Sequence, residues 1–382
     1  MKNLAALKEH NIAKTNVLYM ALELGQGKWR IAFGNGAKQR QIVIEAADLV
    51  KLSEEIQKAK HKLHLAADVQ FISCYEAGRD GFWIHRYLTE CGIINYIVDS
   101  SSIEVNRRAR RAKTDRLDAE KLLKQLIRFV GGEADIWSVV RVPNQEAEDA
   151  RRLHREMQAL KKERKRHINR IKALLALYGI RYKNKSRQKW ENYIEKVRDW
   201  NNQPLPTHVK AELLHEIRRL NLVEEQLTEI ETQMLQAMQT NNDPVIQQIA
   251  QLIMLKGVGL ISAWELVMEW FSWRNFKNRR EVGALAGLTG TPYDSGNSQR
   301  EQGITKSGNR RIRALIIQLA WMWLRYQPKS QLTLWFNKRF NESKRFRKIG
   351  IVALSRKLLI ALWRCAMQNT IPTGAELKVA EV

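Results

Sequence analysis

The chain has 382 residues, and its 65 Lys and Arg against 40 Asp and Glu give a formal net charge of +25. This excess of cations indicates a polyanionic partner, which favours nucleic acid. No apolar stretch reaches the ~18 residues that a spanning helix needs, and the N-terminus reads as polar, so we expect no membrane segment and no signal peptide. The three cysteines, Cys74, Cys91 and Cys365, lie far apart, which predicts a cytoplasmic protein without a cysteine metal cluster.

Residues 16–125 predict an α/β layer fold with a mixed sheet, because an initial hairpin is followed by strands that alternate with helices. Helices are expected at about 47–62 and 81–90. Strands are expected at 16–24, 28–33, 41–45, 68–76 and 94–99.

Four acids stand where such a fold builds sites. Glu23 and Glu76 end the first and fourth expected strands, at the carboxyl edge of the sheet. Asp115 and Asp118 lie three apart and would share one helix face. Together they could hold two Mg²⁺ (or Mn²⁺) ions about 4 Å apart, suited to in-line attack on a phosphodiester. Each acid also has a structural alternative, as a surface acid, a helix cap or a helix N-terminal charge.

A run of cations directly precedes the paired aspartates and would hold phosphates beside them. Its alternative is an ordinary solvated helix of mixed charge. The run contains Arg107, Arg108, Arg110, Arg111 and Lys113.

Residues 143–238 read as two long helices. The first carries a dense positive face, on which Arg151, Arg152 and Arg155 are candidate nucleic-acid contacts. The second carries apolar residues at spacings of three, four or seven, typical of a coiled-coil seam. An interchain seam would make a homo-oligomer, a dimer or a tetramer; a helical hairpin packed on its own domain is the alternative. The seam residues are Leu213, Ile217, Leu220, Leu227, Ile230 and Met234.

Residues 245–370 are expected to be mostly helical. The turn at Lys256, Gly257 and Gly259 is typical of a helix-hairpin-helix, in which backbone amides meet DNA phosphate. A polar loop is expected from Asp294 to Ser307, and tryptophans such as Trp321, Trp323 and Trp335 are expected in the core rather than as base-stacking platforms.

The order of the motifs is itself informative. They are Ser73-Cys74-Tyr75-Glu76-Ala77-Gly78, Val98-Asp99-Ser100, Lys113-Thr114-Asp115-Arg116-Leu117-Asp118-Ala119, Trp137-Ser138-Val139-Val140-Arg141-Val142-Pro143, Gly287-Leu288-Thr289-Gly290-Thr291-Pro292-Tyr293-Asp294-Ser295-Gly296 and Gly303-Ile304-Thr305-Lys306-Ser307-Gly308-Asn309-Arg310. Over almost the whole chain, this order resembles the serine-containing DEDD transposases of bacterial insertion sequences, relatives of the Piv DNA invertase.

The resemblance implies three regions: a RuvC-like (RNase H-type) domain at 1–135, a coiled-coil helical region at 136–242 and a mostly α transposase domain at 243–382. It implies a metal-binding acid tetrad of Glu23, Glu76, Asp115 and Asp118, and Ser295 as nucleophile. It also implies a structured guide RNA from the element, pairing with donor and target DNA. One position differs from the family's pattern. This chain has Ala21-Leu22-Glu23 where the family usually has Gly-Ile-Asp.

A serine that attacked phosphorus would hold the DNA end as a phosphoserine ester, so rejoining would need no ATP. Cations near it would steer phosphate or stabilise the transition state: Arg300, Lys306, Arg310 and Arg311. Alternatively, Asp294 to Asn297 is a surface turn, and Ser298 and Ser307 are rival nucleophiles.

Three functions therefore compete: a DNA transposase or site-specific recombinase, a metal-only nuclease like a Holliday-junction resolvase, and a nucleic-acid-binding protein with an altered active site. The charge and the acids favour the first two, and Glu23 keeps the third open.

Overall fold

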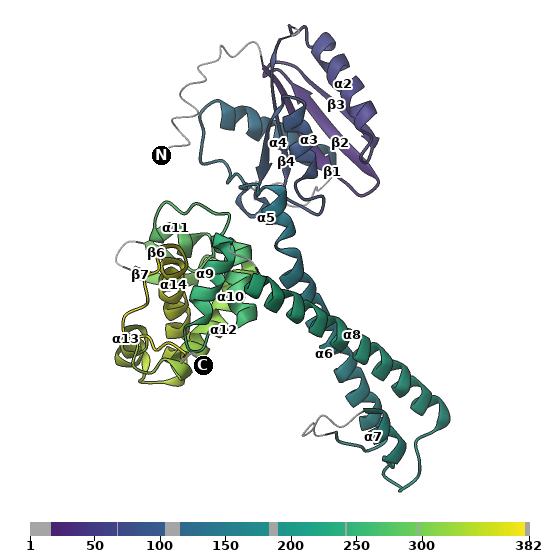
Figure 1. The fold of residues 1–382 in the computed structure, drawn as a ribbon. Helices are drawn as coiled ribbons and strands as arrows, with labels where there is room; N and C mark the ends of the chain where they lie inside the picture. Colours follow the sequence, from purple (N-terminus) through teal and green to yellow (C-terminus); the bar gives the residue numbers. More distant parts are fainter. Residues whose placement is uncertain are drawn as a thin grey trace. The chain divides into compact units, whose positions relative to one another are not determined.

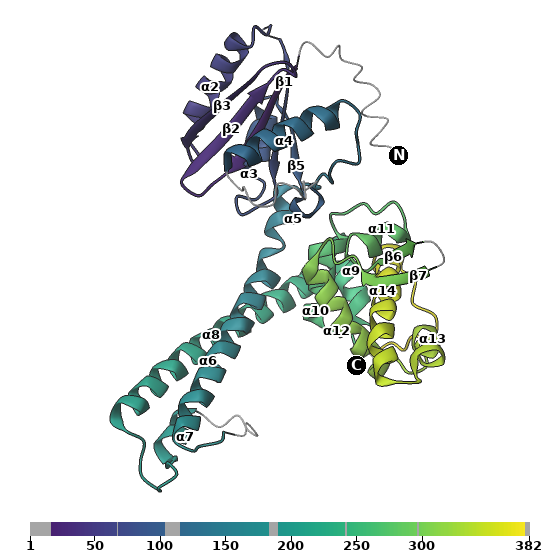
Figure 2. The same ribbon diagram turned by 180° about the vertical axis from the view of Figure 1, so that it is seen from behind.

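The computed structural model describes residues 17–66, 68–103, 115–182, 190–240, 243–295 and 298–378. The chain divides into two compact units, residues 1–142 and 143–382, which are coloured along the sequence in Figures 1 and 2. Within the described part, no helix combines the length and apolarity that crossing a bilayer requires.

The first unit is built on a five-stranded mixed sheet of order β3-β2-β1-β4-β5. β1 pairs antiparallel with β2 and parallel with β4, and β3 and β5 form the edges. The predicted mixed sheet is thus present. The strands are β1 (Val17–Leu24), β2 (Lys28–Gly34), β3 (Gln39–Glu45), β4 (Gln70–Glu76) and β5 (Ile94–Val98).

Alternation along β1 divides its side chains between two cores. Leu18, Met20 and Leu22 pack with α2 (Leu49–Lys62) and α3 (Trp83–Glu90), whereas Tyr19 and Ala21 pack with α4 (Asp115–Val130). The sheet is therefore covered on both faces, by α2 and α3 on one and α4 on the other (Figures 1 and 2).

The first unit ends at residue 142, seven residues beyond the predicted boundary at 135. Ile136 and Trp137 are buried in the core under α4. Val139 forms a β-bridge with Val98, and the Val140 amide donates to the Ile97 carbonyl at 2.7 Å. This segment belongs with the sheet because it pairs with the end of β5, the edge strand.

The second unit begins with a long helical hairpin formed by α6 (Arg152–Leu177) and α8 (Thr207–Thr240). The short helix α5 (Gln145–Asp149) precedes α6, and the short helix α7 (Trp190–Lys196) lies between α6 and α8 in the chain. All six predicted seam residues on α8 are buried within the single chain: the first three pack with Ile171 and Leu175 of α6, the last three with Met157 and Leu160. A contact between chains would therefore need other residues of the hairpin.

In the rest of the second unit, the elements that the structure describes are helices and one β-hairpin, β6–β7, which lies where a polar loop was expected. Its strands are mostly polar and lack the apolar alternation that marks a strand. The elements are α9 (Pro244–Ile253), α10 (Leu260–Leu266), the π-helix η3 (Val267–Phe271), α11 (Arg279–Ala284), β6 (Gly290–Ser295), β7 (Ser298–Ile304), α12 (Arg310–Tyr326), α13 (Gln331–Phe340) and α14 (Lys344–Gln368).

Candidate functional site

Glu23 and Glu76 end neighbouring parallel strands. Leu22 of β1 lies opposite Tyr75 of β4, so the two glutamates follow at the same level of the sheet. Ala21 and Cys74, two residues earlier on each strand, belong to the core under α4. Because side chains two apart in a strand share a face, both glutamates lie on the α4 side of the sheet.

The helix α4 brings the paired aspartates to that same face. The Cys74 thiol lies 3.9 Å from the Leu122 carbonyl, and Ala119 is buried in the same core. Asp118 stands one turn before Leu122 and is partly buried. Asp115 begins the helix, but its side chain lies outside the described part.

The described carboxylates are not gathered around a common point. Among the side chains that the structure describes, no three or more His, Cys, Asp or Glu are arranged to hold a metal ion. Carboxylate oxygens alone are nevertheless the donors that Mg²⁺ and Mn²⁺ prefer. The sheet thus brings Glu23, Glu76 and Asp118 to one face, without assembling a complete ligand set.

The cations that precede α4, Arg107 to Lys113, lie in residues 104–114, outside the described residues. Their predicted contact with phosphate stays a prediction.

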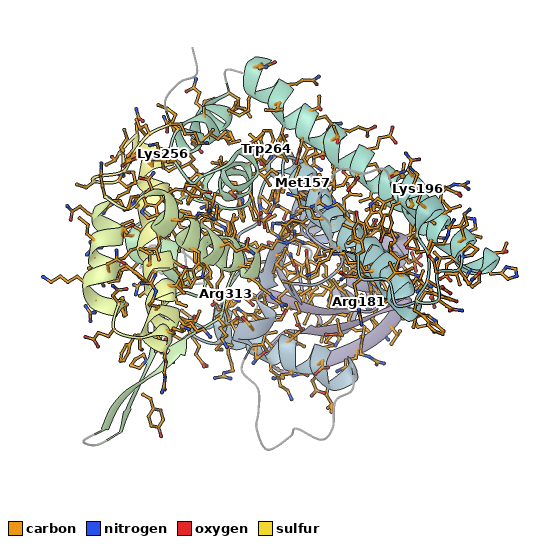
Figure 3. The ribbon with its side chains drawn as sticks, turned by 90° about the horizontal axis from the view of Figure 1, so that it is seen from below. Met157, Arg181, Lys196, Lys256, Trp264 and Arg313 are labelled. Carbon is orange, nitrogen blue, oxygen red and sulfur yellow. The ribbon has the colours of Figure 1, made fainter. Side chains whose placement is uncertain are left out.

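Ser295 is the last residue of β6 and stands opposite Ser298, the first residue of β7. It therefore lies at the free end of a two-stranded hairpin that projects from the helices around it (Figure 3). The side chains of Ser295, Ser298 and Arg300 are outside the described part. Of the two rival serines, Ser298 therefore lies at the same end of the hairpin as Ser295, whereas Ser307 follows β7 at the opposite end.

Two glycines close the base of this hairpin. A Cβ on Gly287 would lie 2.3 Å from the Ser307 carbonyl oxygen, and one on Gly308 would lie 2.0 Å from that of Leu285. Both have positive φ, +69° and +106°, which glycine adopts without strain. The close approach lets the Asn309 amide donate to the Leu285 carbonyl at 2.9 Å. The hairpin thus leaves the helical body through a tightly bonded neck.

The predicted phosphate-binding cations differ in their availability. Arg151 is 4% exposed and stacks on Trp273 at 5.0 Å, and Arg155 is bonded to Glu269. Both therefore have structural partners inside the unit. Three others are exposed: Arg152, Lys306 and Arg310. Arg311 is exposed as well, and its guanidinium donates to the Gln158 side chain at 2.9 Å.

The helix-hairpin-helix-like turn is packed by other parts of the same unit. The Lys256 ammonium lies 2.7 Å from the Glu376 carboxylate, and its amide donates to the Glu376 carbonyl. A Cβ on Gly257 would lie 3.2 Å from that of Tyr326. Gly259 begins α10 as its N-cap. Phosphate binding by this turn stays a prediction, and it would compete with the Glu376 ion pair.

Comparison with known proteins identifies the chain's family. Residues 250–334 match the family described as Transposase IS116/IS110/IS902. The chain is 40% identical over 375 residues to y4rJ of Sinorhizobium fredii, a transposase by name, and the match covers 94% of each protein. It is also 26% identical over 264 residues to the transposase for insertion sequence element IS1328 of Yersinia enterocolitica, covering 68% of this chain and 73% of that protein.

The chain belongs to the IS116/IS110/IS902 family of transposases. In this transposase, the segment that matches the family contains Ser295 and both strands of its hairpin, and it lies wholly within the second unit. The four acids lie in the first unit, and the match to y4rJ, which covers 94% of the chain, includes most of that unit.

The transposase also has a buried carboxylate cluster that sequence reasoning did not single out. Glu265 and Glu269 are 5% and 4% exposed. The available signal was two glutamates four residues apart in the apolar run Leu260 to Phe271. Acids in such a run are costly unless they are bonded.

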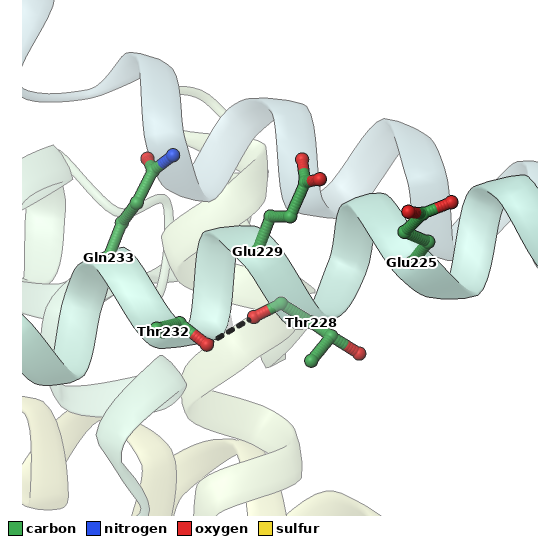
Figure 4. A pocket seen from close by; sticks show the side chains of 5 residues that line it. All are labelled: Glu225, Thr228, Glu229, Thr232 and Gln233. Carbon is green, nitrogen blue, oxygen red and sulfur yellow. Dashed lines mark hydrogen bonds between the residues drawn. The ribbon is translucent and has the colours of Figure 1, made fainter.

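A surface hollow on α8 has the wrong charge for nucleic acid. It is lined by Glu225, Thr228, Glu229, Thr232 and Gln233. Figure 4 shows the two carboxylates on the same side of the helix, and the Thr232 hydroxyl donating to the Thr228 carbonyl at 2.9 Å. The two carboxylates would repel phosphate here, so this side of α8 is unsuited to nucleic acid.

Proposed function

We propose that this transposase cuts and rejoins DNA strands through an ester between Ser295 and a DNA phosphate. The observation that carries the proposal is the position of Ser295 at the free end of the projecting hairpin, inside the segment that matches the family. A nucleophile that must reach a DNA backbone is well placed at the end of a projecting hairpin.

The exchange is balanced in atoms and charge. The Ser295 hydroxyl oxygen forms a bond to phosphorus, its proton leaves to a base, and the bond from phosphorus to a deoxyribose oxygen breaks. The displaced oxygen takes up a proton and becomes the free DNA hydroxyl. Attack by a DNA hydroxyl on the phosphoserine ester reverses these steps and rejoins the strands.

Glu23, Glu76, Asp115 and Asp118 would hold Mg²⁺ or Mn²⁺ at the α4 side of the sheet. A bound divalent cation would neutralise phosphate charge there. The extra methylene of Glu23, compared with Asp, extends its carboxylate from the strand end by about one bond length. The exposed Arg152, Lys306 and Arg310 are suited to phosphates.

The proposal includes a guide RNA and a homo-oligomer. A net charge of +25 is compatible with binding of RNA as well as DNA, since both are polyanions. A dimer or tetramer would join through exposed residues of the α6–α8 hairpin, because its apolar seam is already filled.

A covalent adduct tests the serine. Wild type, Ser295→Ala and Ser298→Ala are incubated with element-end DNA, Mg²⁺ and RNA transcribed from the element, and separated on a denaturing gel. We expect a protein–DNA adduct with wild type and Ser298→Ala and none with Ser295→Ala. An equal adduct with Ser295→Ala would place the nucleophile elsewhere, and cleavage without an adduct in any protein would favour a metal-only nuclease. Omitting the RNA tests its requirement.

The acid site has its own test. Asp118→Asn should abolish cleavage, because it removes a carboxylate from the α4 face. Glu120→Gln is the matched control, since Glu120 lies on the same helix and its carboxylate is ion-paired to Lys124 at 2.9 Å. Unchanged cleavage by Asp118→Asn would refute the metal-site assignment.

A further inference from the structure

Glu269 joins three segments of the second unit: α6, its own π-helix and the residue before α12. Its carboxylate accepts hydrogen bonds from His154 at 3.1 Å and from two guanidinium nitrogens of Arg155 at 3.1 and 2.9 Å. The Asn309 side-chain amide donates to it at 3.3 Å. His154 and Arg155 belong to α6, Glu269 belongs to the π-helix, and Asn309 precedes α12.

The hydrogen bonds to Glu269 favour its ionised form. Burial by itself raises the pKa of this carboxyl group, but the hydrogen bonds from His154 and Arg155 outweigh burial and lower the pKa to about 2. The group is therefore an anion at neutral pH. π-helical turns are rare and often mark functional positions, and this one carries the anion that joins the segments.

Asn309 connects that anion to the neck of the serine hairpin. Its side-chain oxygen accepts hydrogen bonds from the backbone amides of Arg311 and Ile312 and so caps α12. Its backbone amide donates to the Leu285 carbonyl. Because the side-chain nitrogen of Asn309 donates to Glu269, its side-chain oxygen is turned towards the amides at the start of α12. Glu269 thereby fixes the point at which β7 leads into α12.

The length of the hairpin amplifies any shift at this point. From Gly290 to Ser295 the strand spans roughly 17 Å, so a tilt of roughly 5° at the neck moves the serine by about 1.5 Å. A misplacement of about 1 Å can cost on the order of a hundredfold in rate.

We propose that Glu269 is a positioning residue for Ser295: it couples α6 to the neck of the β6–β7 hairpin and sets where the serine is presented. This inference rests on the proposed role of Ser295 as nucleophile. Glu269 acts through Asn309 and does not touch the reacting atoms.

Two variants test the coupling. Glu269→Gln removes the anion, and Asn309→Ser keeps a residue that caps helices well but loses the donor to Glu269. We expect both to lower the rate of adduct formation at least about tenfold while the Kd for element-end DNA changes less than about threefold. Glu265→Gln is the matched control: it is equally buried and one turn away, it is bonded to Gln158, and it should keep the wild-type rate.

Hydrogen–deuterium exchange separates positioning from loss of the fold. Both variants should speed exchange within 285–309 and leave α9 and α14 protected. Wild-type adduct rates in both variants, or faster exchange spread over all helices in both, would overturn the inference. If wild type itself forms no adduct that depends on Ser295, the proposed function fails, and exchange in 285–309 still decides whether Glu269 anchors the hairpin.

Discussion

At the scale of single residues, the second unit contains two glutamates whose environments shift their pKa values in opposite directions. Burial, partly offset by a hydrogen bond from Gln158, raises the pKa of Glu265. Glu269, one turn later, has its pKa lowered because bonds from His154 and Arg155 outweigh the same burial. The two therefore contribute to stability in different pH ranges.

Glu269 should make the unit sensitive to acid. Its pKa is about 2 in the folded protein against an ordinary 4.5, so its contribution is present above pH 4.5 and is lost as the pH falls towards 2. The shift corresponds to roughly 3 kcal/mol. Urea unfolding of wild type and Glu269→Gln at about pH 5 and pH 3.5 checks this: the variant should be less stable at the higher pH and change less between the two. An identical pH dependence in both proteins would contradict it.

Glu265 should act in the opposite sense. Its raised pKa means that the folded state binds a proton more tightly than the unfolded state, so stability falls as the pH rises from the ordinary 4.5 towards the folded value. Glu265→Gln removes the charge and keeps the hydrogen bond, so we expect unfolding at pH 7 to need at least as much urea as for wild type. A clear loss of stability would show that the ionised form is the one that the fold needs.

At the scale of elements, patterns with strong periodicity predicted structure well. The apolar run along β1 and the apolar spacing along α8 both marked residues that are buried. The hairpin β6–β7 was missed because its pairing depends on backbone bonds rather than apolar side chains.

Trp321 was expected in the core, but it is 41% exposed on α12, whereas Trp323 is buried; the choice between neighbouring positions is made by tertiary packing. The anion at Glu269 was also beyond sequence reasoning, since its partners lie up to 115 positions away.

The hairpin neck should be intolerant of side chains. Gly308→Ala places a Cβ 2.0 Å from a backbone oxygen at positive φ, so we expect a loss of several kcal/mol in unfolding free energy and no adduct. Gly303→Ala is the control, because its φ is also positive, +94°, but no atom lies within 4 Å of the added Cβ; it should cost only about 1 kcal/mol. Equal losses in the two variants, measured by urea unfolding, would rule out the clash as the cause.

At the scale of the whole molecule, only some of the Lys and Arg side chains are free to bind phosphate, because others are buried or paired with acids. On α6, Lys165 is exposed and has no ion-pair partner among the described residues, whereas Arg170 on the same helix is paired with Glu212. The buried Arg151 and the bonded Arg155 show why a count of cations overstates the surface open to phosphate. Sequence reasoning found the basic helix and could not sort its members, because the sorting depends on α8 and the π-helix.

The salt dependence of DNA binding should distinguish Lys165, which has no ion-pair partner among the described side chains, from the paired Arg170. If α6 contacts phosphate, Lys165→Ala should weaken binding and reduce the slope of log affinity against log salt by about 1. Arg170→Ala should change the slope much less, since its charge is already neutralised by Glu212. Fluorescence anisotropy over a series of salt concentrations measures both, and equal slopes for Lys165→Ala and wild type would show that Lys165 does not contact phosphate.

The glycine neck also bears on how copies of such an element decay in a genome. Any change to the first or second base of a glycine codon gives a stop codon or a residue with a Cβ, and at Gly287 and Gly308 a Cβ has no room. Most single-nucleotide changes at these two codons therefore silence a copy while leaving its reading frame intact. Full-length copies that no longer move should carry lesions at these codons more often than at glycine codons with open space, such as Gly27 and Gly36.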